Sequence, residues 1–197
     1  MTPDHADSAA LSAARFSVVD VETSGLSARR HRVLQVAVVT VNGEGTVLDT
    51  WVSLVRPRNR WMFRVGPRHI HGLSRSELRA APKAHLVLAE LSRRLQGSTF
   101  TAHNARFDAT FLRESARRSH IVLQLTPLLC TLKLSRQLDP ERQLSHRLTD
   151  ICKRYDIPLD RPHDALEDAI ATAAVLPRLL AEHNVTTVSQ VAGLTTP

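Results

Sequence analysis

The segment RVLQVAVVTV, residues 32–41, constrains the fold more than any other part of the chain, because it is apolar almost without interruption. A strand of this kind is covered on both faces, which places it near the centre of a sheet. Asn42 and Gly43 follow it and predict a tight turn. Residues 46–55 are therefore expected to return as a strand antiparallel to 32–41.

Two more strands and several helices complete the expected framework. Apolar residues three to four positions apart predict the helices, and short β-branched runs predict the strands. Pro177 is expected to kink or end the last helix, because proline lacks the N–H that a helix interior needs. The further strands are expected over 15–22 and 98–102, and the helices over 84–96, from about Asn104, over 129–138, over 146–156 and from about Ala165. This order of elements predicts an α/β sheet covered by helices.

The chain length of 197 residues fits one domain with a substantial core, or at most two small ones. We expect one domain over 15–183, with a flexible tail over 1–14 and a C-terminal tail over 184–197. Cys130 and Cys152 have no CxxC partner, so we interpret them as reduced core residues of a cytoplasmic protein. No apolar run approaches the roughly 18 residues of a membrane span, and the N-terminus does not resemble a signal peptide.

The charge balance makes a polyanionic partner plausible, since 26 Lys and Arg face 19 Asp and Glu. A basic but inert surface has the same balance. Residues 56–68 hold five Arg and no acid, with Trp61 and Phe63 between them. This segment either contacts phosphates and bases, or is a solvated loop that its aromatic residues anchor to the core. Arg29, Arg30 and Arg32 are further candidates for contacts along a nucleic acid strand.

The segment FSVVDVETSG, residues 16–25, carries two acids in a run that otherwise predicts a buried strand. Because side chains alternate along a strand, Asp20 and Glu22 share one face. Two neighbouring carboxylates repel, so either a cation lies between them or one takes up a proton. On an edge strand they would instead face water. Gly25 ends the strand, and strand ends are where sites form in α/β sheets.

Two later segments add acids at helix starts. Asp108 follows Asn104 and Phe107, and each of these has a structural interpretation as a dipole, capping or core residue. In PHDALEDA, residues 162–169, Asp164 and Glu167 fit a capping box. Asp168 lies one turn further, on a surface of small residues that can approach the sheet, and His163 precedes the helix.

Together these acids form a set of hard oxygen ligands without a cysteine. Such a set suits Mg²⁺ or Mn²⁺ better than structural zinc. Two such ions would clamp the attacking and leaving oxygens of a phosphodiester, while a nearby histidine takes a proton from water. The four carboxylates are Asp20, Glu22, Asp108 and Asp168.

Three motifs in order resemble those of the DEDDh, DnaQ-like family of 3′–5′ exonucleases, including the proofreading type of DNA polymerase III. They are DVETSG at 20–25, HNARFD at 103–108 and HDALEDA at 163–169. The resemblance spans residues 16–176. It implies a ribonuclease H-like fold with a mixed five-stranded sheet flanked by helices.

The resemblance also implies a reaction and its residues. Asp20, Glu22, Asp108 and Asp168 would bind two divalent cations, Mg²⁺ or Mn²⁺, with Asp20 bridging. His163 would be the general base, and the product would be a nucleoside 5′-monophosphate. The positions implied to contact the terminal nucleotide are Thr23, Ser24, Leu26, His71, Asn104 and Phe107. Leu26 has an alternative interpretation as a core residue, and Gln35 stands where many relatives have Glu.

The expected substrate is a single-stranded 3′ end, with DNA favoured over RNA in a proofreading or repair role. RNA trimming by the same chemistry is one alternative. A nucleic-acid-binding scaffold without catalysis is another, which the intact set of acids and histidine argues against. A DNA polymerase or clamp partner is open, and no membrane partner is expected.

Overall fold

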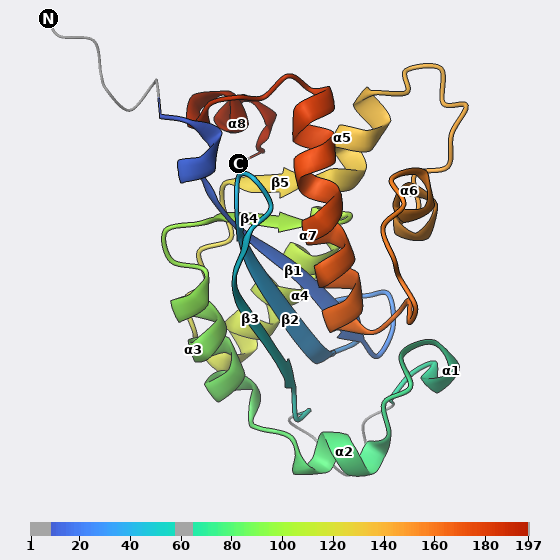
Figure 1. Ribbon diagram of the computed structural model, residues 1–197. Coiled ribbons are helices and arrows are strands. Elements are labelled where there is room, and N and C mark those ends of the chain that lie inside the picture. Colours follow the sequence, from blue (N-terminus) through green and yellow to red (C-terminus); the bar gives the residue numbers. More distant parts are fainter. Residues whose placement is uncertain (1–8, 58–64, 197) are drawn as a thin grey trace, which may run out of the picture.

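A computed structural model describes residues 9–57 and 65–196 of the chain. Its centre is a mixed five-stranded sheet in the order β3-β2-β1-β4-β5 (Figure 1). The long strands β1 (Arg15–Thr23), β2 (Val33–Asn42) and β3 (Val47–Leu54) are antiparallel neighbours. The short strands β4 (Thr99–Ala102) and β5 (Leu128–Cys130) extend the sheet in parallel to β1. The expected α/β fold with a ribonuclease H-like sheet is confirmed.

Strand β1 divides the core between the two faces of the sheet. Phe16 and Val18 point into one apolar cluster, whereas Val19 and Val21 point into the other. Strand β2 contributes to both clusters, which explains its nearly continuous apolar sequence.

Helices cover both faces. Helix α7, with α5 and α6, packs on one face, and α3 and α4 pack on the other (Figure 1). The short helices lie in connections and at the ends of the described chain. The bounds are η2 Leu11–Ala13, α1 Arg68–His71, α2 Arg75–Ala80, α3 Ala84–Arg94, α4 Ala105–Ser119, α5 Thr131–Gln137, α6 Leu148–Arg154, α7 Ala165–Glu182 and α8 Val188–Leu194.

Helix α7 continues through Pro177 to Glu182, so the proline does not end it. Leu176, Leu179 and Leu180 are fully buried on either side of the proline. Their packing holds the helix together despite the missing N–H, since tertiary contacts supply most of the stability of a helix in a protein.

Two segments differ from the sequence-based expectation. The helix expected over 129–138 begins only at Thr131, because residues 128–130 form β5 and Leu129 pairs with Thr101. A three-residue apolar run carries no periodicity that separates a strand from a helix. The described part of the expected C-terminal tail contains α8, whose Val191 is buried and whose first turn Thr187 caps.

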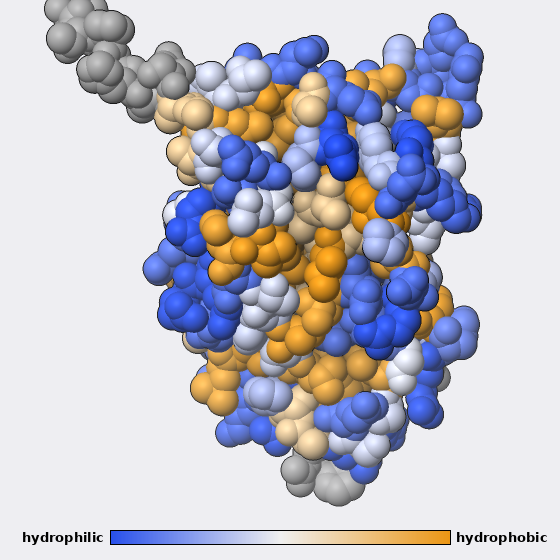
Figure 2. Space-filling model, viewed as in Figure 1, coloured by the Kyte–Doolittle hydropathy of each residue, from blue (hydrophilic) through white to orange (hydrophobic). Residues whose placement is uncertain are grey.

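The two margins of the sheet differ. At the β5 margin, Leu128 exchanges backbone hydrogen bonds of 2.9 and 2.8 Å with Thr196. At the β3 margin, Val47, Leu48 and Val52 are exposed. Apolar side chains are visible in the middle of the face seen in Figure 2, over the region where β3 and α7 lie in Figure 1.

The connection between β3 and α3 contains α1 and α2. Trp61 and Phe63 lie outside the described residues, so the proposed base contacts of that segment stay a prediction. Cys130 and Cys152 are free thiols, the second of them buried. Among the described residues, no helix is both long and apolar enough to cross a membrane.

Candidate active site

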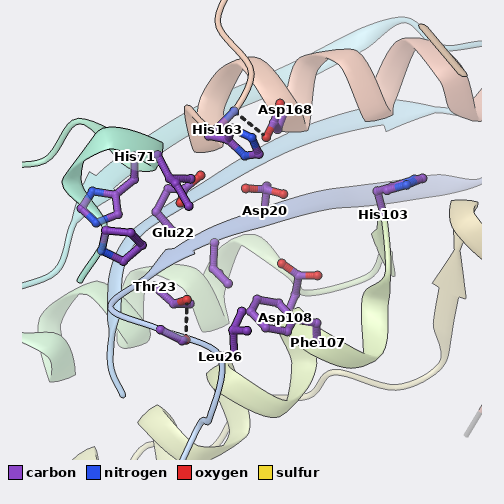
Figure 3. Close-up of a pocket in the computed structure, with 14 residues that line it drawn as sticks. Asp20, Glu22, Thr23, Leu26, His71, His103, Phe107, Asp108, His163 and Asp168 are labelled. Carbon is purple, nitrogen blue, oxygen red and sulfur yellow. Dashed lines mark hydrogen bonds between the residues drawn. The ribbon is translucent and has the colours of Figure 1, made fainter. Parts of the chain in front are cut away.

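A pocket of about 440 Å³ lies where β1 ends, between the start of α7 and the start of α4 (Figure 3). Nine of the eleven residues predicted for the site line it. They are Asp20, Glu22, Thr23, Leu26, His71, Phe107, Asp108, His163 and Asp168.

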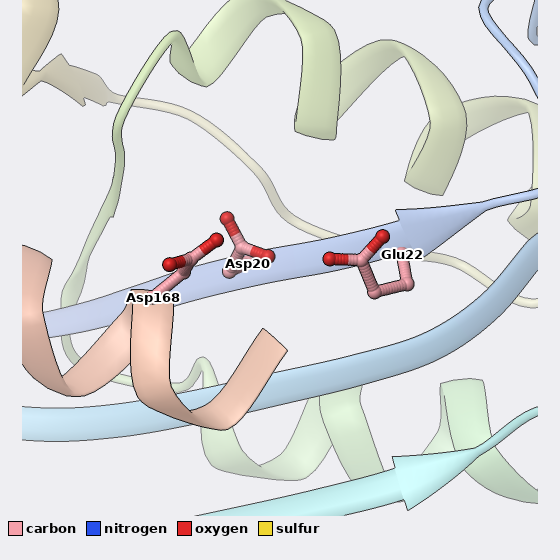
Figure 4. A group of neighbouring side chains, drawn as sticks. All are labelled: Asp20, Glu22 and Asp168. Atoms are coloured by element: carbon pink, nitrogen blue, oxygen red, sulfur yellow. The ribbon is translucent and has the colours of Figure 1, made fainter. Parts of the chain in front are cut away.

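Three carboxylates converge on one side of the pocket. Asp20 and Glu22 share a face of β1, and Asp168 projects from the first turn of α7, so that ligand oxygens of all three lie within 4.8 Å of one another (Figure 4). Helix α7 comes this close to the sheet because Ala165, Ala169 and Thr172 beside the acid are small and buried. We call Asp20, Glu22 and Asp168 the carboxylate cluster.

Asp108 faces the pocket from the first turn of α4, on the opposite side of β1. Its residue is only 3 % exposed. It is not one of the three residues whose oxygens lie within 4.8 Å of one another. The four predicted acids therefore line one pocket, with Asp108 set apart from the cluster.

Burial and mutual repulsion disfavour the charged forms of these acids. Desolvation, with added repulsion from Asp168 and Asp164, raises the pKa of Glu22 to about 8. Desolvation also raises the pKa of Asp20 well above its ordinary value, with Asp108, Asp168 and Glu22 adding repulsion. The pKa of Asp108 is likewise raised well above its ordinary value by burial. Without a cation, these side chains hold protons at pH values where exposed carboxylates are ionised.

The cluster fits divalent cations. Asp168 Oδ1 is buried and has no hydrogen-bond partner among the described residues. An unsatisfied buried carboxylate oxygen is costly, and a hard cation is the ligand that satisfies several such oxygens at once. Asp20, Glu22 and Asp168, with Asp108 across the pocket, are the residues that would hold the ions.

His163 lies on the loop before α7, with its side chain exposed and at the edge of the pocket. Its backbone N–H donates to Asp168 Oδ2 at 3.1 Å, which ties the loop to the cluster (Figure 3). Its φ of 70° lies in the left-handed region. Asp164 caps α7 as expected, accepting from the N–H of Leu166 and Glu167.

The capping box predicted for Asp164 and Glu167 does not close. The Glu167 carboxylate instead accepts from Arg161 at 2.6 Å. The guanidinium of Arg161, on the loop before α7, carries a full positive charge and is therefore a stronger donor than the neutral N–H at the cap.

Apolar and hydroxyl groups form the other wall of the pocket. Leu26 is 87 % exposed, which excludes its interpretation as a core residue. It lies at a turn where the Thr23 hydroxyl donates to the Gly25 carbonyl at 2.9 Å. Phe107 packs on Phe111 with ring centroids 4.9 Å apart and presents its remaining surface to the pocket.

Three residues predicted to contact the substrate either make structural hydrogen bonds or lie outside the pocket. His71 lines the pocket, but its Nδ1 accepts from the Leu73 N–H and its Nε2 faces the Val65 carbonyl, which holds the ring in place. Ser24 is buried outside the pocket lining, and its hydroxyl accepts from the Arg32 N–H at 3.0 Å. Asn104 is exposed at the start of α4 and does not line the pocket.

The sequence analysis did not assign a role to His103, which lines the pocket. Its Nε2 donates to the His146 carbonyl at 3.1 Å, and its Nδ1 lies 3.0 Å from the Thr131 hydroxyl. Burial lowers the pKa of His103 to about 4, so the ring is neutral. Its place in the HNARFD motif was the available signal. Pro67 and Ile70 also line the pocket, but no sequence pattern indicates them.

The exonuclease family RNase_T matches residues 17–176. The PolC-type DNA polymerase III of Bacillus cereus is 33% identical over 165 residues, which are 84% of this chain and 11% of that protein. The PolC-type enzyme of Bacillus subtilis is 32% identical over 166 residues, with the same coverage. The chain thus spans about a tenth of the length of these curated relatives.

Solved structures share the fold. E. coli exonuclease I in complex with a dT13 oligonucleotide superposes with a TM-score of 0.75 at 21% identity, over 87% of this chain and 42% of that one. Exonuclease X in complex with 5′ overhanging duplex DNA superposes with a TM-score of 0.69 at 24% identity, over 91% and 98%. At these identities the likeness shows the fold alone.

Proposed function

Because this chain belongs to the RNase_T family of exonucleases, in its DEDDh, DnaQ-like group, we propose that it hydrolyses DNA stepwise from the 3′ end. The observation that carries the proposal is the carboxylate cluster, whose oxygens lie within 4.8 Å of one another beside His163. We propose that two divalent cations, Mg²⁺ or Mn²⁺, bind there, and that single-stranded ends are preferred.

The cations, when bound, stabilise negative charge on the phosphodiester and acidify the attacking water. The imidazole of His163 accepts the proton of that water. The water oxygen bonds to phosphorus, the bond from phosphorus to the 3′ oxygen breaks, and that oxygen takes a proton from solvent. The products are a nucleoside 5′-monophosphate and a strand with a new 3′ hydroxyl.

The two walls of the pocket would contact different parts of the terminal nucleotide. The carboxylates of Asp20, Glu22, Asp108 and Asp168 lie where the phosphodiester reacts. Leu26 and Phe107 offer apolar surface to the terminal base and sugar, and Thr23 lies between the walls. A volume of about 440 Å³ is in the range of pockets that enclose a small ligand, which suits one unpaired nucleotide.

DNA is proposed over RNA on the strength of the relatives, which are named DNA polymerases, and of the solved neighbours, which hold DNA. The test uses end-labelled single-stranded DNA and RNA of one sequence with Mn²⁺. The wild-type protein is expected to shorten the DNA stepwise from its 3′ end.

His163→Asn is the informative variant, because asparagine tolerates the left-handed backbone of this position better than alanine does. The backbone N–H that bonds Asp168 stays in place. We expect kcat to fall roughly 10²–10⁴-fold, as for loss of a general base. Preferential loss of RNA would overturn the DNA assignment. No cleavage of either strand by folded protein with Mn²⁺ would overturn the enzymatic function and leave a scaffold.

A further inference from the structure

A second hollow lies beside the active-site pocket, where α3 begins and α4 ends. It consists of two adjoining pockets of about 540 and 270 Å³, which share Arg56, Pro57, Ala84, Arg118 and Ser119. Six basic residues line it, and we call this surface the basic groove. They are Arg32, Arg56, Lys83, His85, Arg118 and His120.

The basic groove has an unbalanced positive charge. No Asp or Glu is among the described residues that line either pocket. Arg56 and Lys83 form no ion pair within the described ranges 9–57 and 65–196. The Arg32 guanidinium donates to the carbonyls of Arg30 and His31. Arg118 forms an ion pair with Glu114 at 2.8 Å, so the excess positive charge of the groove comes chiefly from Arg56 and Lys83, and a bound anion would offset it.

The two unpaired cations are held side by side by the backbone. Arg56 follows β3 and its N–H donates to the Pro82 carbonyl at 2.8 Å, within an isolated bridge between Arg56 and Lys83. Lys83 is also the cap of α3, whose first N–H groups have no acceptors within the helix. The positive end of that helix therefore reinforces the charge of the side chains.

A single loop joins the basic groove to the active-site pocket. Leu26 at its start lines the active-site pocket, and Arg32 at its end lines the groove. Arg118 braces the loop, because its guanidinium donates to the carbonyls of Ala28, Arg29 and His31 at 2.6–3.2 Å. Val33, the next groove residue, lies opposite Thr23 of the active-site pocket in the pairing of β1 with β2.

We propose that the basic groove binds the backbone phosphates of the DNA strand on the 5′ side of the nucleotide that occupies the active-site pocket. The cations come from four separate elements and are spread along the groove, which suits successive phosphates of a strand better than one compact anion. The direction of the strand in this proposal rests on the proposed function, whereas the binding of phosphates rests on the charge and shape of the groove.

The test removes the two unpaired charges in Arg56→Gln/Lys83→Gln and measures binding of fluorescent single-stranded DNA by anisotropy in EDTA, from 50 to 300 mM salt. Arg15→Gln/Arg178→Gln is the matched control. It removes two exposed, unpaired positive charges at the other end of β1 and on α7, away from both pockets. Each variant is tested with a 20-mer and a 4-mer.

For the groove variant we expect roughly tenfold weaker binding of the 20-mer at low salt, and a salt slope that is smaller by about 1.4, the value for two lost phosphate contacts on a single strand. Binding of the 4-mer, which is too short to run the length of the groove from the active-site pocket, should fall by much less than binding of the 20-mer. Equal losses in the groove variant and the control would overturn the proposal, as would an unchanged slope.

A second measurement separates this proposal from the proposed function. Hydrolysis of the 4-mer with Mn²⁺ should proceed at the wild-type rate in the groove variant. If the wild type hydrolyses neither length but the groove variant still loses binding of the 20-mer, the groove stands and the proposed function fails. If hydrolysis is normal and binding of both lengths is unaffected, the groove fails alone.

Discussion

Two buried clusters of acid and polar groups lie within this domain, and they differ in how well they are satisfied. In the first, Asp139 accepts hydrogen bonds from the N–H groups of Gln143 and Leu144 at 3.1 and 2.9 Å, and its Oδ2 lies 3.1 Å from His146 Nε2. His146 Nδ1 lies 2.9 Å from the Ser135 hydroxyl. The backbone bond from Leu144 is the largest cause of the lowered pKa of Asp139.

The second is the carboxylate cluster, where every shift has the opposite sign. Burial raises the pKa of Asp20, Glu22 and Asp168, and the Asp168 Oδ1 atom has no partner within the described chain. Asp139 receives two backbone N–H donors, whereas the carboxylate cluster receives one, from His163, and keeps an unsatisfied oxygen beside like charges. The second arrangement is the one expected where a cation from outside the chain would supply the positive charge.

The largest expected difference between the two clusters is in catalysis. Asp20→Asn should lower kcat by more than roughly 100-fold. Loss of a group that only supports a metal ligand costs up to about that much, and loss of a ligand itself should cost more. Asp139→Asn should keep activity within about threefold, because its network reaches the pocket only through the backbone carbonyl of His146. Steady-state hydrolysis of labelled DNA compares them, and equal losses would break the distinction between the clusters.

Cation binding gives the next effect. Mn²⁺ at 100 times its Kd should stabilise the wild-type protein by about 2.7 kcal/mol, or roughly 5–10 °C in Tm for a chain of this size. Asp20→Asn/Glu22→Gln should lose the shift, and Asp139→Asn should retain it. Thermal unfolding with Mn²⁺ and with EDTA provides the comparison. A shift that survives in the double variant would place the cation elsewhere.

The smallest effect is in the pH dependence of the metal-free protein. The folded-state pKa of Glu22 is raised to about 8, so its contribution to stability is full below pH 4.5 and is lost as the pH rises through 8. Glu22→Gln should therefore gain in Tm relative to the wild type as the pH rises from 5 to 8. The contribution of Asp139 to stability has the opposite pH dependence. Because its pKa is lowered in the folded protein, its contribution is present at neutral pH and is lost as the pH falls through the folded-state pKa.

Thermal unfolding in EDTA from pH 4 to pH 9 measures both signs. If the wild type and Glu22→Gln follow parallel curves, burial and the neighbouring acids do not raise the pKa of Glu22. The Tm difference between the wild type and Asp139→Asn should be largest at high pH and shrink as the pH falls; if it shrinks as the pH rises instead, the donors around Asp139 do not act as the geometry indicates.

The satisfied and the unsatisfied cluster were not equally predictable from the sequence. Alternation along a strand predicts that Asp20 and Glu22 share a face, whereas the roles expected for Asp108 and Asp168 came from the resemblance of the motifs. Oxygens of Asp20, Glu22 and Asp168 lie within 4.8 Å of one another. The network of Asp139 depends on a loop that folds back on α5, and no local pattern reports such a contact.

Local sequence patterns also fail to show which of the residues predicted to contact the substrate line the pocket. Ser24 and Asn104 belong to the motifs but do not line the pocket. The Ser24 hydroxyl accepts from the Arg32 N–H, and Asn104 is exposed at the residue before α4. Strand β5 was missed for a related reason. Its three residues are fixed by pairing with β4, which is a contact between distant segments and leaves no trace in periodicity.

The unequal margins of the sheet limit how copies of this protein can join. At the β5 margin the backbone of Leu128 is hydrogen-bonded to the backbone of Thr196, whereas β3 is the last strand at the other margin. A fibril that grows by strand addition needs two free edges on every molecule, one for the copy before and one for the copy after. Because Leu128 is already paired at the β5 margin, β3 is the edge of the described sheet at which a second copy of the chain could add a strand.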